Sequence, residues 1–524
     1  MARLIRPAFL LPVSLLLGLL FDFLFWGKPI GVSFPIFVLL LLAAGFWLAG
    51  RAGLKPARNS LWLLVPIAFF SLVPAFRTEP LTVFLSAIAA LLLLMLFAAS
   101  FLGGLWPRYG FADYIAKLLG LVPLGLGSLR DTAPVARSKK GKKPALQILG
   151  TILRGLLFAL PLLWFLAVLL SSADPFFAEW LGDLFAGFDK APEYITRGFI
   201  VLILGYCFAA IYMYAFARSK KQPLLGAEKP LVAPFLGWGE ALTMLVSVNL
   251  LFLAFVVVQF RYFYGGLANI IEGPTGYTFA EYARRGFGEL VVAAVTTLMF
   301  FIILSALTKR KTGSQQTWFS GLGIALFALV AVILVSAFER LLLLEQAYGF
   351  TRLRTYPHVF MIWLGVLLLA VVVLEALGRQ RAFALAVAAA VVGFTASLAL
   401  LNVDGFIAAT NVARAADGSQ LDFRYLGSLS ADSVPSLIAG YTQANEAGNS
   451  ELAQELAISL ACHFSRADAL PLAAWQGWNL SADTSRAQWE SLSAEPGFPE
   501  FQVTGTSGVT LNGESFTCSY QAFD

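Results

Sequence analysis

The sequence has little charge and few of the side chains that enzymes commonly use for chemistry. Only 13% of its 524 residues are charged, and it contains two histidines and three cysteines. A soluble globular protein carries about 25% charged residues, so this shortage excludes that class. His358 and His463 are far apart, and neither belongs to an HExxH or Cys/His zinc pattern. We therefore expect no metal site.

Nucleotide-binding and hydrolase motifs are also missing. Gly120, Gly125 and Gly127 have the wrong spacing for a dinucleotide fingerprint, and no strand precedes them. The stretch GTSGV at Gly505 does not fit the GxSxG nucleophile pattern. The net charge of +6 comes from basic residues spread over the predicted connectors, so it does not indicate nucleic-acid binding. We expect no cofactor and no nucleic-acid partner.

What the sequence does contain is long apolar runs. Hydrophobic residues make up 59% of the chain, and the mean hydropathy is +0.77. A run of about 20 apolar residues is long enough to cross a bilayer as a helix. The sequence therefore predicts an all-α polytopic membrane protein whose domain 1–402 has about 11 transmembrane helices: 8–26, 31–50, 61–76, 81–102, 147–170, 198–217, 238–260, 286–307, 316–338, 357–377 and 382–402.

The distribution of lysine and arginine predicts the orientation. With a cytoplasmic N-terminus, 23 of the 37 basic residues fall on the inner side, against 10 in the short outer connectors and 4 in the C-terminal tail. Cytoplasmic connectors are the ones enriched in basic residues. We therefore expect the N-terminus inside and the C-terminus outside.

The longest inner connector, residues 103–146, has two parts. Trp106 to Leu126 mixes aromatic, charged and leucine residues, which is typical of a helix lying in the headgroup layer. The basic run from Arg137 to Lys143 is suited to anionic lipid, although such a run also serves simply as a topology determinant.

The composition changes after Leu401, and residues 403–524 are predicted to form a small extracytoplasmic α+β domain. Ser430–Tyr441 and Asn449–Phe464 have helical spacing, and the alternation around Asn512-Gly513 predicts a closing β-hairpin. Cys462 and Cys518 both lie in this domain. They are candidates for a disulfide, and the alternative is two unconnected thiols.

Two outer connectors, around residues 261–290 and 339–358, concentrate charge and tyrosine. Glu281, Arg285 and Glu289 share one face of a predicted helix. We expect the two connectors to meet in one charged cluster. The cluster is either an ion-pair network or a site where arginines hold a phosphate or carboxylate headgroup, with Glu281 or Glu345 available as a base. Its candidate residues are Arg261, Glu281, Arg284, Arg285, Glu289, Glu339, Glu345, Arg352 and Arg354.

Inside the predicted spans, charged residues lie near the helix ends, where snorkelling lowers the cost of burial. Asn249 is the main deep polar residue, and we expect it to bond between helices. A chain of carboxylates at mid-membrane, which a proton-coupled transporter would need, is missing.

Several sequence blocks together resemble a bacterial polytopic membrane family catalogued as a domain of unknown function, DUF 4173, related to DUF 4153. The resemblance runs from about Leu146 to Asn479. It implies a membrane architecture and a bacterial origin, hence the cytoplasmic membrane, but no activity. The blocks are SSADPFF, RYFYGG with TFAEYARRGFGEL, EQAYGFTRLRTYPHVFMIWL, NVDGFIAATNV and LDFRYLGSLSADSVPSL.

Three functional classes are consistent with the sequence. The first is a non-enzymatic envelope protein whose outer charged surface binds a ligand or a partner protein of the envelope. The second is a carrier for lipid or small molecules, against which the lack of mid-membrane charge counts. The third is a membrane enzyme acting on a lipid-linked substrate from outside, against which the lack of metal, cysteine and histidine constellations counts.

Overall fold

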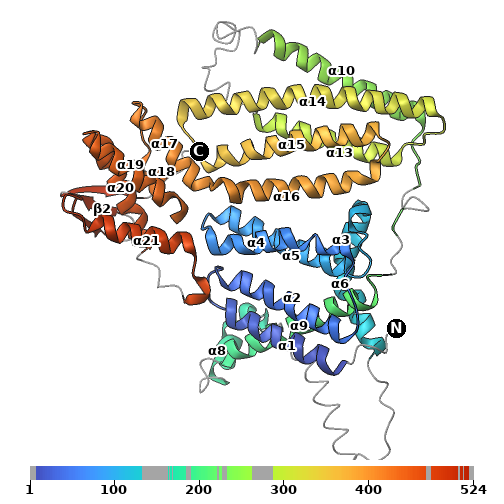
Figure 1. Cartoon of the computed structure of the whole chain (residues 1–524), viewed down its shortest axis with the longest axis horizontal. Coiled ribbons are helices and arrows are strands. Elements are labelled where there is room, and N and C mark those ends of the chain that lie inside the picture. Colours follow the sequence, from blue (N-terminus) through green and yellow to red (C-terminus); the bar gives the residue numbers. More distant parts are fainter. Residues whose placement is uncertain are drawn as a thin grey trace, which may run out of the picture.

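The structure is a computed structural model, and the residues described are 7–132, 163, 166–167, 169–184, 191–220, 224–226, 233–262, 287–467, 474–504, 508–511 and 513–518. It is an all-α membrane protein with a small C-terminal α+β part (Figure 1). Within these residues, ten helices are long and apolar enough to cross a membrane. A helix satisfies its own backbone hydrogen bonds, which is what the hydrocarbon core requires.

The first half of the bundle is formed by helices before residue 220. Its core gathers buried residues of α1, α2, α4, α5 and α9, such as Leu10, Val38, Ile67 and Met213. Its helices are α1 (Pro7–Phe25), α2 (Ser33–Arg51), α3 (Arg58–Leu61), α4 (Leu64–Phe76), α5 (Pro80–Ser100), α6 (Phe111–Thr132), α8 (Pro175–Leu184) and α9 (Ala191–Ala217), with the 3-10 turn η1 (Trp106–Arg108) before α6.

The second half has a separate core around Phe301, Phe327 and Val371. Asn249 donates from α10 to the carbonyl of Leu322 in α14 at 3.2 Å, which confirms its predicted role between helices. The two halves meet where α16 packs against α5 (Figure 1). The helices are α10 (Trp238–Tyr262), α13 (Phe287–Leu307), α14 (Gly313–Tyr348), α15 (Arg352–Ala376) and α16 (Phe383–Leu401), with η2 (Gln380–Ala382) before α16.

Nine of the ten candidate spans coincide with predicted ones. The predicted span 8–26 corresponds to α1, whose described apolar part, Phe9–Phe25, is shorter than the others. The predicted span 147–170 lies almost entirely outside the described residues. The tenth candidate is α6, Phe111–Ser128, in the stretch assigned from its sequence to the headgroup layer.

Helix α6 lies across one end of the bundle rather than along it (Figure 1). Near its start, the buried Asp113 accepts a hydrogen bond from Arg381 of η2 at 3.2 Å and one from the backbone N–H of Leu225 at 2.8 Å. Near its other end, Ser128 accepts a hydrogen bond from Arg218, just after α9, at 2.7 Å. Helix α6 therefore ties the two halves together at this end, where the basic connectors 51–58, 308–312 and 378–382 also lie.

The C-terminal part covers the opposite end of the bundle (Figure 1). The chain enters it through Asn402, whose φ of 53° is the left-handed conformation that asparagine tolerates better than most residues. Its helices are α17 (Val403–Ala416), α18 (Phe423–Gly427), α19 (Val434–Glu446), α20 (Ser450–Ala467) and α21 (Leu480–Ser493), with 3-10 turns η3 (Ala431–Ser433) and η4 (Trp475–Gly477).

This part contacts both halves of the bundle. The carbonyl of Trp478 accepts a hydrogen bond from Val32, between α1 and α2, at 2.9 Å. The Asn479 amide donates to the carbonyls of Pro74 and Arg77, each at 2.8 Å. Helix α17 follows α16 directly and packs on α15. The C-terminal part therefore contacts helices from both cores at this end of the bundle.

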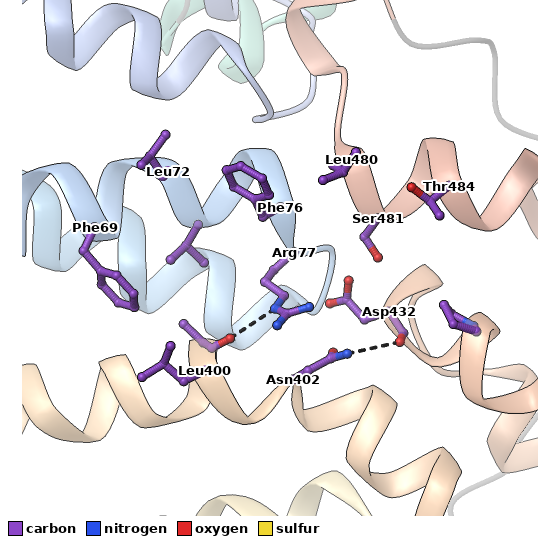
Figure 2. Close-up of a pocket in the computed structure, with 13 residues that line it drawn as sticks. Phe69, Leu72, Phe76, Arg77, Leu400, Asn402, Asp432, Leu480, Ser481 and Thr484 are labelled. Carbon is purple, nitrogen blue, oxygen red and sulfur yellow. Dashed lines mark hydrogen bonds between the residues drawn. The ribbon is translucent and has the colours of Figure 1, made fainter.

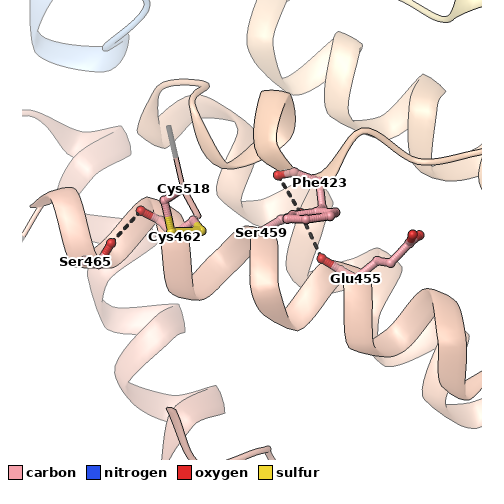
Figure 3. Close-up of a disulfide and its surroundings, with 6 residues drawn as sticks. All are labelled: Phe423, Glu455, Ser459, Cys462, Ser465 and Cys518. Atoms are coloured by element: carbon pink, nitrogen blue, oxygen red, sulfur yellow. Dashed lines mark hydrogen bonds between the residues drawn. A yellow bond between two sulfur atoms is a disulfide. The ribbon is translucent and has the colours of Figure 1, made fainter. Parts of the chain in front are cut away.

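The sheet has three strands where the sequence predicted a two-stranded hairpin. They are β1 (Phe501–Thr504), β2 (Gly508–Leu511) and β3 (Glu514–Thr517), in the order β1-β2-β3 with antiparallel pairing. The stretch before residue 512 is divided into two strands that pair with each other. Gly513, with φ 89°, is the second residue of the predicted Asn512-Gly513 turn and lies between β2 and β3. A disulfide joins Cys462 of α20 to Cys518, directly after β3 (Figure 3).

Candidate functional site

The predicted charged cluster is only partly within the described residues. Glu281, Arg284 and Arg285 lie outside them, and so does most of the connector that contains them. Arg261 belongs to the last turn of α10. Whether the two connectors meet therefore stays a prediction.

The remaining candidates do not form one cluster. Glu289 and Glu339 are exposed, and no described residue pairs with Glu289. The buried Glu345 lies 3.1 Å from Nδ1 of His358, and Arg354 donates to the carbonyl of Gly349 at 2.6 Å. These contacts bind α14 to α15 at the turn between them.

Arg352 has a different partner, Asp404 of α17. Its Nε donates to Asp404 Oδ1 at 2.7 Å, and its Nη2 donates to Oδ2. Asp404 is fully buried, and its Oδ2 also accepts from the backbone N–H of Ser430 at 2.7 Å. This bidentate pair fixes the start of α15 to the C-terminal part.

Next to it, Glu79 and Asp432 extend the buried polar region. Glu79 is the N-cap of α5, and its carboxylate accepts hydrogen bonds from the backbone N–H groups of Leu81 and Thr82. It also accepts a hydrogen bond from the Tyr356 hydroxyl at 2.5 Å. Asp432 of η3 accepts from the backbone N–H groups of Thr78 and Glu79 at 2.9 and 3.0 Å. We call Glu79, Arg352, Tyr356, Asp404 and Asp432 the outer polar cluster, after the side of the membrane predicted from the sequence for this end of the bundle.

A cavity of about 500 Å³ opens beside this cluster, between α4, α16, η3 and α21 (Figure 2). Its size is within the range of ligand sites, about 300–1,000 Å³. One wall is apolar, and the other carries charged, amide and hydroxyl groups. The lining residues are Phe69, Leu72, Val73, Phe76, Arg77, Ala399, Leu400, Asn402, Asp432, Pro435, Leu480, Ser481 and Thr484. We call it the outer cavity, after the same predicted side.

Arg77 and Asp432 face each other in the outer cavity, as Figure 2 shows. The Nε of Arg77 donates to the carbonyl of Ala399 at 3.1 Å, and its two terminal nitrogens have no hydrogen-bond partner among the described residues. Asp432 is 2% exposed, its Oδ2 accepts two backbone N–H groups, and its Oδ1 has no partner in the described structure. The two opposite charges are held near each other without an ion pair between these described side chains.

Asn402 adds a second unusual feature to the same wall. It has the left-handed backbone conformation noted above, and its Nδ2 donates to the Asp432 carbonyl at 3.5 Å. Its Oδ1 is buried and, among the described residues, has no hydrogen-bond partner. Buried acceptors without partners are costly, and a bound water, ion or ligand group is one way to complete their bonding.

Two other cavities are almost entirely apolar. One of about 260 Å³ lies between α2, α5 and α9, and one of about 290 Å³ lies between α13, α15 and α16, with Phe111 at its edge. Neither brings charged groups together, so the outer cavity is the better candidate for specific recognition.

The residues of the outer cavity are not among those predicted from the sequence. Arg77, Asp432 and Asn402 lie in three separate segments, and only docking of the C-terminal part brings them together. Two signals were present: Arg77 and Glu79 are charges in the very short connector between α4 and α5, and Glu79-Pro80 is typical of a helix start.

Among the residues that the structure describes, no group of histidine, cysteine, aspartate and glutamate side chains is arranged to hold a metal. No curated protein and no solved structure matches the chain. A family described as a domain of unknown function, DUF4153, matches residues 64–440, which include α4 to α16, Asn402, Asp404 and Asp432. That match covers most of the chain, and so the protein belongs to the DUF4153 family.

Proposed function

We propose that this protein is a non-enzymatic envelope protein of the bacterial cytoplasmic membrane, and that its extracytoplasmic end binds a lipid-like amphiphile. The ligand's polar head would occupy the charged side of the outer cavity, and its chain would lie along the apolar side. A single observation carries the proposal. The outer cavity has an apolar wall on one side, and on the other side a guanidinium group and a carboxylate that form no ion pair with each other.

The apolar wall is suited to an acyl chain. Leu72, Phe76 and Leu400 are 46%, 48% and 70% exposed, and they lie in the last turns of α4 and α16. Side chains of this kind on the outside of a membrane helix face lipid. A chain entering from the bilayer would therefore reach the outer cavity without crossing water.

The polar wall is suited to a headgroup. Arginine binds phosphate and carboxylate through parallel N–H donors, and the terminal nitrogens of Arg77 are not used by the described residues. Ser481, Thr484 and Asn402 add groups that can both donate and accept hydrogen bonds. The outer cavity lies at the helix ends, where the headgroups of one leaflet lie.

The excess of basic residues in connectors at the opposite end supports the orientation. The C-terminal part, residues 403–524, would then be extracytoplasmic and would form the roof of the outer cavity. The basic run Arg137–Lys143, which is outside the described residues, would face anionic lipid on the inner side. A partner protein of the envelope would contact the C-terminal part.

Photo-cross-linking tests the proposal. A photoreactive side chain replaces Leu400 at the outer cavity or, as the control, Leu369, which is 65% exposed on α15 and does not line this cavity. The full chain is extracted from membranes and washed in steps with detergent before illumination. We expect lipid cross-links to persist at Leu400 after those at Leu369 have disappeared, because bulk lipid exchanges faster than bound lipid.

The variant Arg77→Gln, made in the Leu400 background, should reduce the retained cross-link, because the headgroup loses a charge-assisted partner. The matched control is Arg424→Gln, which alters an exposed arginine of the C-terminal part. If lipid leaves both positions at the same rate in the unsubstituted background, the outer cavity does not bind an amphiphile.

A further inference from the structure

We propose that the outer cavity selects a phospholipid whose headgroup carries both a phosphate and a primary ammonium. This inference rests on the proposed function, and it adds the chemical class of the ligand. It follows from the two charges of the outer cavity, from the buried oxygens that lack partners, and from the charge balance around them.

Arg77 provides the phosphate side. Its Nε is held by the Ala399 carbonyl at 3.1 Å, which fixes the plane of the guanidinium group. Its two terminal nitrogens are left for a ligand, and their fork matches two oxygens of one phosphate. Because Arg77 follows directly after α4, a phosphate bound there lies at the depth of the headgroups, with the acyl chain toward Phe69 and Leu72.

Asp432 provides the ammonium side. Its Oδ2 is held by the backbone N–H groups of Thr78 and Glu79. Its Oδ1 is buried, has no partner among the described residues, and belongs to a carboxylate that extends toward Arg77 (Figure 2). A primary ammonium supplies three N–H donors, whereas a quaternary one supplies none. The amide oxygen of Asn402, also buried and without a described partner, is a second acceptor for such donors.

The charge balance favours a headgroup with both signs over an anionic one. Of the charged groups in this region, Arg77 and the buried Asp432 line the outer cavity, while Arg352 and the buried Glu79 and Asp404 do not. Arg352 is already bound to Asp404. A phosphate without an accompanying cation would therefore share the outer cavity with the uncompensated carboxylate of Asp432, and like charges repel strongly where burial lowers the dielectric constant.

A headgroup series on the unsubstituted protein tests the inference. The full chain, with the photoreactive group at position 400, is placed in vesicles that hold equal amounts of four lipids with the same acyl chains. Their headgroups are phosphoethanolamine and its N-methyl, N,N-dimethyl and N,N,N-trimethyl forms. We expect capture to fall with each methyl group, by about tenfold over the series, since charge-assisted hydrogen bonds are lost. The same vesicles with the photoreactive group at position 369 should show no preference.

The variant Asp432→Asn tests the assigned partner. The asparagine keeps the shape of the side chain and one oxygen that can accept from the backbone N–H groups of Thr78 and Glu79. The variant should lose most of the preference for the unmethylated headgroup, while lipid is still captured. Asp417→Asn, at an exposed aspartate, is the matched control and should leave the preference unchanged. If Asp432→Asn does not fold, the headgroup series alone decides.

The outcomes separate the inference from the proposed function. Retained lipid with equal capture of all four headgroups, or a preference for phosphatidylglycerol in a parallel mixture, would overturn the inference and leave the proposed function standing. Loss of retained lipid at position 400 would overturn both. Soluble glycerophosphoethanolamine, which has the headgroup but no acyl chains, should compete only weakly with the lipid for capture at position 400. Competition as strong as that of the lipid would show that the ligand is not a membrane lipid, and would overturn the inference.

Discussion

The guanidinium group of Arg352, at the first position of α15, donates to both carboxylate oxygens of Asp404 in the first turn of α17. The two residues are 52 positions apart, and the pair connects a helix of the second half to the C-terminal part. A buried carboxylate that loses its partner is left uncompensated, which costs about 3–5 kcal/mol.

Breaking this pair should therefore destabilise the protein strongly. We expect Arg352→Gln to lower the free energy of unfolding by about 3–5 kcal/mol, and the double variant with Asp404→Asn to lose less than the sum of the two single variants. Thermal unfolding in detergent measures this, with Arg424→Gln as a control that should change stability by less than about 0.5 kcal/mol. Additive losses would show that the pair does not couple.

The Cys462–Cys518 disulfide should be detectable by thiol labelling. The chain has three cysteines, so the unreduced, denatured protein should react at Cys207 alone, and the reduced protein at all three. Cys518→Ser should destabilise the C-terminal part by about 2–4 kcal/mol, because the bond closes a long loop in the unfolded chain. Labelling of all three thiols without reduction would contradict the bond.

Glu455 should make stability depend on pH. Burial, and secondarily the charge of Glu451, raises the pKa of the Glu455 carboxyl in the folded protein. The folded chain therefore holds a proton that the unfolded chain releases, and stability falls as pH rises through this range. We expect Glu455→Gln to raise the unfolding midpoint at pH 7, and the gain to disappear below about pH 4, where the carboxyl is protonated in both states. An equal gain at both pH values would be inconsistent with this cause.

The orientation can be read with fused reporters. A reporter that is active only in the cytoplasm should be active when fused after Lys143 and silent when fused after Asp524, because basic connectors stay inside. The opposite pattern would place the C-terminal part and the outer cavity on the cytoplasmic side.

The sequence was sufficient for the architecture but not for the site. Apolar runs near 20 residues determine where helices cross, because lipid requires complete internal hydrogen bonding. The placement of α6 was harder to predict, since its charged residues Asp113 and Lys117 are buried while Leu119 is 74% exposed. This reverses the usual pattern of an amphipathic helix, and composition alone does not distinguish the two arrangements.

The site depends on contacts between distant segments. Tyr356 and Glu79 are 277 residues apart, and Asp432 and Thr78 are 354 apart. Charge in the two connectors selected Arg352 and Glu345 as candidates for ion pairs or for ligand binding, but it did not point to their partners, Asp404 and His358. The outer cavity was missed because it exists only where the C-terminal part docks on α4 and α16.

The most direct test of the central claim is a density map of the full chain isolated in nanodiscs together with its native lipids. The proposed function predicts an elongated density in the outer cavity, with its broad end against Arg77 and Asp432 and its tail along Phe69 and Leu72. Ordered lipid elsewhere on the bundle, together with an outer cavity that is closed by side chains or holds only water, would contradict it.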